Sequence, residues 1–155
     1  MTVLAATLLQ RLRRRRRERG SAIVEFVFLG VLVTLPVFYL VVALARLQAG
    51  AYAVSAASRE AGRTFVTAES SGAAPARARS AAAIAFADQG FPGQGQVAIT
   101  CSAAPCLTRD AQVGTQATLE VPLPFVPGFV SDVVPTAITV TARHVESVDR
   151  FGEQP

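Results

Sequence analysis

Several residue types on which catalytic and metal sites depend are scarce in this chain of 155 residues. It has no tryptophan and no lysine, one histidine, one methionine and two cysteines. A zinc site needs three or four ligands at short spacings, and the sequence offers no such set. No acid, cysteine or serine cluster is placed around His144, so we expect it on the surface of a strand. The sequence predicts a protein that is not an enzyme and needs no metal or cofactor.

Charge is also scarce, and it is unevenly distributed. Charged residues make up 17% of the chain and apolar residues 51%, whereas an average soluble domain has about 25% charged residues. Residues 1–20 carry a net charge of +6, and the rest of the chain carries −2. This composition excludes a disordered chain and a wholly soluble one, and the length allows for one domain.

The longest apolar run has no charged residue from Phe26 to Ala45. An α-helix rises 1.5 Å per residue, so about 20 residues cross the roughly 30 Å hydrocarbon core of a bilayer. Pro36 removes one backbone donor and predicts a kink. We expect this run to form a single membrane-spanning helix.

Arginines are concentrated before the run, and only Arg46 lies close behind it. The positive-inside rule then predicts a cytoplasmic N-terminus, with residues 46–155 outside. A nucleic-acid patch is the alternative, but the arginines have no interleaved aromatics and no basic domain follows, so we expect no nucleic-acid partner. A cleaved secretory signal stays open, with possible cuts after Ala45 and Ala51. The arginines of the topology signal are Arg13, Arg14, Arg15, Arg16, Arg17 and Arg19.

A carboxylate, Glu25, stands directly before the apolar run. At the edge of a membrane helix it is either a headgroup-level residue or a functional one. It follows Gly20 by five residues, with basic residues before the glycine and apolar residues after the glutamate. With the small-residue continuation through 59–63 (REAGR), residues 13–64 resemble the N-terminal region of TadE-like proteins, pseudopilins of the tight-adherence (Flp) type IV pilus assembly system.

The resemblance implies that a prepilin peptidase cuts between Gly20 and Ser21 on the cytoplasmic side. Ser21 stands where major pilins carry an aromatic residue, which favours a minor pilin or pseudopilin. The implied partners are the membrane, other pilins or pseudopilins, and the inner-membrane assembly platform. Glu25 would set the register between subunits by pairing with a neighbour's Ser21 amine. The alternative is a single-pass, membrane-anchored binding module unrelated to pili.

Helical spacing of small and apolar residues continues behind the run. We expect one helix from Ala22 to about Thr67, with residues 21–47 in the membrane and 48–68 as a stalk that packs on its own head domain. Pro75 predicts the start of a second helix that stops at Gly90. The residues of the stalk stripe are Leu47, Ala51, Val54, Ser58, Ala61 and Phe65.

The remaining residues, 69–155, predict a small extracytoplasmic head. Segments 97–101, 117–121 and 138–142 alternate apolar and polar residues, which predicts antiparallel strands covered on one face. The proline-rich segment 122–135 is an apolar loop that either covers the sheet or contacts a partner. Outside the cytoplasm, Cys101 and Cys106 are expected to form a disulfide.

The predicted architecture is therefore α+β. A basic cytoplasmic leader (1–20) precedes a long transmembrane and stalk helix, and the head contributes a second helix and a short antiparallel sheet.

Overall fold

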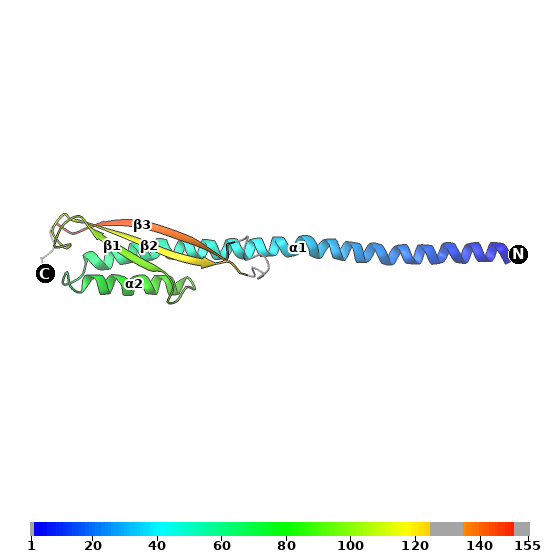
Figure 1. Ribbon diagram of the computed structural model, residues 1–155, viewed down its shortest axis with the longest axis horizontal. Coiled ribbons are helices and arrows are strands. Elements are labelled where there is room, and N and C mark those ends of the chain that lie inside the picture. Colours follow the sequence, from blue (N-terminus) through cyan, green and yellow to red (C-terminus); the bar gives the residue numbers. More distant parts are fainter. Residues whose placement is uncertain (1, 125–134, 151–155) are drawn as a thin grey trace. The chain divides into compact units, whose positions relative to one another are not determined.

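The computed structural model describes residues 2–124 and 135–150, with side chains from residue 21 onward (Figure 1). The described residues form two helices and one three-stranded antiparallel sheet, which confirms the predicted α+β class. The chain divides into two compact units, Met1–Val41 and Val42–Pro155. The elements are α1 (Thr2–Val66), α2 (Ala74–Asp88), β1 (Gln96–Cys101), β2 (Gln112–Pro122) and β3 (Ala137–Ser147).

The first unit consists of the N-terminal part of α1. This helix begins at Thr2, so the prediction that it begins at Ala22 is wrong. Leucine, alanine, glutamine and arginine dominate residues 2–19 and are strong helix formers, so the helix extends through the basic leader. It also continues through Gly20 and Pro36 and ends at Val66, one residue from the predicted end.

The second unit contains the rest of α1, α2 and the sheet, which has the strand order β1-β2-β3. All three predicted strands are present, but β2 and β3 are each eleven residues long. The sequence pattern missed the first half of β2 because Gln112, Gly114 and Gln116 have low strand propensity. That half pairs with β3 in continuous register, and Thr115 lies opposite His144.

The C-terminal part of α1 packs against the inner face of this sheet. Gly50 lies so close to Val121 that a side chain at position 50 would clash with the valine. Farther along, Thr115 Oγ1 donates a 2.7 Å hydrogen bond to the Ser58 carbonyl, which is buried with it. The helix therefore packs on the head, as predicted, because its residues from Ala43 onward contribute buried positions.

Four of the six residues of the predicted stripe are buried: Val54, Ser58, Ala61 and Phe65. Leu47 is half-buried, and Ala51 is exposed, which contradicts its predicted position in the stripe. The true buried face is wider because α1 contacts both the sheet and α2, so neighbouring columns of the helix are covered. The additional buried positions are Ala43, Gly50, Ala53, Ala57 and Gly62.

Helix α2 begins with Pro75 in its first turn, as predicted, and ends two residues before Gly90. Gly90 has a φ of +83°, a left-handed conformation that favours glycine after a helix. Phe91, which follows, is completely buried, and the Arg46 guanidinium lies 5.2 Å from its ring centroid. This cation–π contact joins α1 to the loop after α2.

Pro122, the first residue of the proline-rich segment 122–135, is also the last residue of β2. At its base, the Leu123 amide donates a 2.8 Å hydrogen bond to the Thr136 carbonyl. Residues 125–134, on which the prediction of an apolar loop rests, lie outside the described residues.

Candidate functional site

The surface of α1 from residue 21 to residue 44 is apolar on all sides. Its large apolar side chains from Ile23 to Phe38 are between 51% and 78% exposed. Within Ser21–Val66, the most apolar window has a mean hydropathy of 2.6, and only 6% of it is buried. The core helix of a soluble protein would be mostly buried, and a surface helix would have a polar face. By length and composition, α1 is long and apolar enough to cross a membrane.

Glu25 lies inside this apolar surface. Its neighbours Val24 and Phe26 are 69% and 78% exposed, and the glutamate itself is exposed. Among the residues whose side chains the structure describes, none forms a hydrogen bond or ion pair with Glu25. A carboxylate at the edge of a membrane helix is costly unless water or a partner meets it.

The helix brings the three predicted residues of the processing and registry site together. Gly20 and Ser21 are adjacent in α1, and Glu25 follows Ser21 by four positions, about one helical turn. Residues four apart share a helix face, and their axial separation is about 6 Å. The predicted topology arginines lie in the preceding turns of the same helix, but their side chains are outside the described structure.

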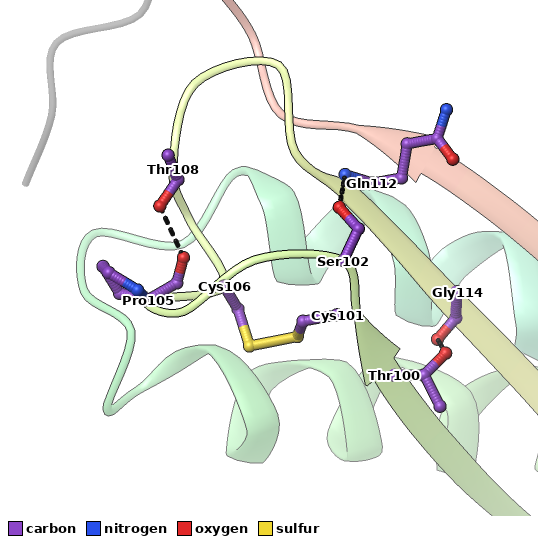
Figure 2. Close-up of a disulfide and its surroundings, with 8 residues drawn as sticks. All are labelled: Thr100, Cys101, Ser102, Pro105, Cys106, Thr108, Gln112 and Gly114. Atoms are coloured by element: carbon purple, nitrogen blue, oxygen red, sulfur yellow. Dashed lines mark hydrogen bonds between the residues drawn. A yellow bond between two sulfur atoms is a disulfide. The ribbon is translucent and has the colours of Figure 1, made fainter.

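The second predicted feature is the cysteine pair at the end of β1. A disulfide joins Cys101 to Cys106 in the loop between β1 and β2 (Figure 2). The loop is also held by hydrogen bonds. Ser102 exchanges bonds with the Gln112 amide and carbonyl at 2.8 and 2.9 Å, and Thr108 Oγ1 donates to the Pro105 carbonyl at 2.6 Å. Leu107, which follows Cys106 in this loop, is buried in the core, so the cross-link closes one end of the core.

We expect the exported protein to have no reactive thiols. Without reduction, its mass should be two hydrogens below that of the dithiol form, and alkylation should label neither Cys101 nor Cys106. Replacing both with serine should lower the free energy of unfolding by about 2–3 kcal/mol at most, because the closed loop is short. The single variant Ser102→Ala, with both cysteines intact, is the control for loop damage. Two freely alkylated thiols in the native protein would contradict this prediction.

His144 lies on a strand, as the sequence predicted, but its side chain is only partly exposed. It lies on the helix-facing side of β3, and its Nε2 is 3.0 Å from Oε1 of Glu146. Both side chains are about a third exposed, at 32% and 35%. A side chain at Gly62 of α1 would lie 3.1 Å from the Glu146 Cγ. The exposure of His144 is reduced because His144 and Glu146, two apart on a strand, share the face that α1 covers.

This polar pair has no nucleophile beside it that is free to react. The nearby Thr115 hydroxyl donates to the Ser58 carbonyl at 2.7 Å, and its distance to the His144 carbonyl is 3.3 Å. Within residues 21–124 and 135–150, no group of three or more histidine, cysteine, aspartate or glutamate side chains could hold a metal ion. The pair packs over Gly62 of α1.

No protein-family model, curated protein or solved structure matches this chain. The candidate site is thus the Gly20–Glu25 stretch of α1, with the apolar surface that follows it.

Proposed function

We propose that this protein is a TadE-like minor pilin or pseudopilin, a non-enzymatic component of a Flp-type (type IVb) pilus. It is anchored in the cell membrane by α1, with its N-terminus in the cytoplasm and its head outside. One observation carries this proposal: Glu25 has no described partner, although it lies among exposed apolar residues, five residues after Gly20. A plain membrane anchor gains nothing from a carboxylate at this position.

Gly20 supports the processing step of this proposal. The bond between Gly20 and Ser21 lies within α1, whereas a protease generally binds its substrate in an extended form. Glycine is about 1 kcal/mol less favourable than alanine in a helix interior, so α1 unwinds more easily here than at its neighbours. A prepilin peptidase would therefore find its cleavage site at the weakest point of the leader.

N-terminal sequencing of the mature protein tests the proposal. In cells with an active prepilin peptidase, the sequence should begin at Ser21. Cells with an inactive peptidase should keep the leader, and so should the variant Gly20→Val. A start at Arg46 or Tyr52 would identify an ordinary secretory signal, and an uncut chain would identify a plain anchored module. Either result would overturn the proposal.

The head should lie outside the cytoplasm. A reporter fused after Pro155 should be active only if it functions outside, because a basic leader precedes a single apolar run. The matched control replaces Arg13 to Arg17 with glutamine, which removes most of the leader's positive charge and should allow a fraction of the chains to invert. Activity of a cytoplasm-dependent reporter in the unaltered protein would contradict this placement.

A further inference from the structure

One long edge of the sheet, along β3, has no strand beside it in the described structure (Figure 1). Hydrogen bonds at the two ends of the β2–β3 pair show which residues of β3 direct their backbone groups toward β2. The Leu123 amide donates to Thr136, and the Val148 amide donates to Ala111. In an antiparallel pair, alternate residues point their backbone groups at the partner. The even-numbered residues of β3 therefore face β2, and the odd-numbered residues point outward.

The outward residues of β3 leave their amides and carbonyls free. Among the described residues, no hydrogen bond is made by the outward backbone groups of Thr139, Thr141, Arg143 or Val145. The one charged side chain in this set turns back over the sheet, where Arg143 Nε donates to Gln116 Oε1 at 2.8 Å. An unpaired strand edge is a template for another strand.

This edge also lacks the features that usually block such pairing. β3 is eleven residues long, contains no proline or lysine, and pairs with β2 in continuous register without a bulge. Natural edge strands are typically shorter, charged or interrupted. An edge of this kind is expected to have a partner.

The opposite edge of the same sheet has a complementary set of free groups. The Ser102 amide donates to the Gln112 carbonyl at 2.9 Å, which fixes the even-numbered residues of β1 as those facing β2. Val97 and Ile99 therefore point their backbone groups outward, and no described residue bonds to them. Because β1 and β3 are each antiparallel to β2, they run in the same direction.

We propose that β3 of one copy of this chain pairs in parallel with β1 of a second copy. The inference rests on the proposed anchoring of both copies in one membrane, which gives their heads the same direction along the membrane normal. A sideways shift then brings β3 beside β1 of the next copy without rotation. Twofold pairing of β3 with β3 would reverse one head, and its membrane helix would leave on the opposite side.

The helical layer beneath the sheet permits this arrangement. Helix α1 packs under β2 and β3 through Gly50 and Gly62, and α2 packs beside β1 through Phe86. A second copy placed beside β3 would therefore bring its own α2 next to α1 of the first copy. The association continues both layers, and it yields an open row of heads rather than a closed dimer.

The variant Thr141→Pro tests the proposal by removing one backbone donor, the amide of residue 141. Proline at this position removes an outward amide and leaves the β2–β3 hydrogen bonds intact. We expect at least a tenfold loss of association between two differently tagged copies in one membrane, because a partner carbonyl is left unpaired. The control Thr141→Val keeps the amide and should associate normally. Unchanged association of Thr141→Pro would overturn the proposal.

A cross-linking experiment determines the direction of pairing and does not depend on how proline is tolerated. Thr141→Cys on one copy and Ala98→Cys on the other place both thiols on the exposed face of the sheet. A short bismaleimide should join these two copies. Cross-linking only between two Thr141→Cys copies would show β3–β3 pairing and overturn the proposal. N-terminal sequencing of the same samples separates a failure of this inference from a failure of the pilin proposal.

Discussion

The variant Glu25→Gln should insert into the membrane and be cut after Gly20, yet lose lateral association with neighbouring subunits. Insertion depends on the apolar run and the arginines, and neither is changed. The proposed cleavage after Gly20 would give Ser21 a free α-amine, which a neighbour's Glu25 would neutralise within the bilayer. Removing one partner of a buried ion pair costs about 3–5 kcal/mol, which corresponds to a hundredfold or greater loss of association.

Two further variants separate charge from shape and from general effects. Glu25→Ala removes both the charge and the volume and should behave as Glu25→Gln does. Glu69→Gln removes one negative charge from an exposed residue after α1 and should have no effect. The measurement is cross-linking to pilins and pilus yield, beside a cleavage assay. Normal association of both Glu25 variants would return this carboxylate to a headgroup-level role.

The variant Gly95→Ala should strongly destabilise the head. Gly95 has a φ of +87°, and a Cβ there would lie 2.6–2.8 Å from three atoms of the buried Phe86 ring. The left-handed backbone costs an L-residue about 1–3 kcal/mol, and overpacking the ring adds about 1–3 kcal/mol. The two together are a large part of the 5–15 kcal/mol that typically stabilises a domain.

A neighbouring glycine provides the matched control. Gly93 also has a positive φ, +68°, but a Cβ there has nothing within 4 Å. Gly93→Ala should therefore show the backbone cost alone. Chemical denaturation of both variants measures the difference, and Phe86→Leu in the Gly95→Ala background should recover part of it. Equal losses for Gly93→Ala and Gly95→Ala would show that the ring contact is unimportant.

Sequence periodicity predicted the elements whose environment is uniform. The strands around Ile99, Leu119 and Val140 alternate because one face is covered by helices and the other is exposed. The second helix followed from Pro75 and Gly90, whose backbone preferences act locally. These signals need no knowledge of the partner segment.

The features that the sequence missed depend on which segments meet. The first half of β2 is extended because β3 faces it, and not because Gln112 and Gly114 favour strands. Ala51 is exposed, and Gly50 beside it is buried, because the position of Val121 decides which column of α1 is covered. The Arg46–Phe91 contact joins residues 45 positions apart, and no local sequence pattern predicts it.

The core packing along α1 also determines how the head would respond to force. The helix and the sheet are joined by contacts from Gly50 to Phe65, a length of about 22 Å along the helix axis. A pull directed along α1 would load these contacts side by side, in shear, so they would have to yield together. A pull at right angles to α1 would peel them apart one after another. The head is thus built to resist tension that arrives through its own helix.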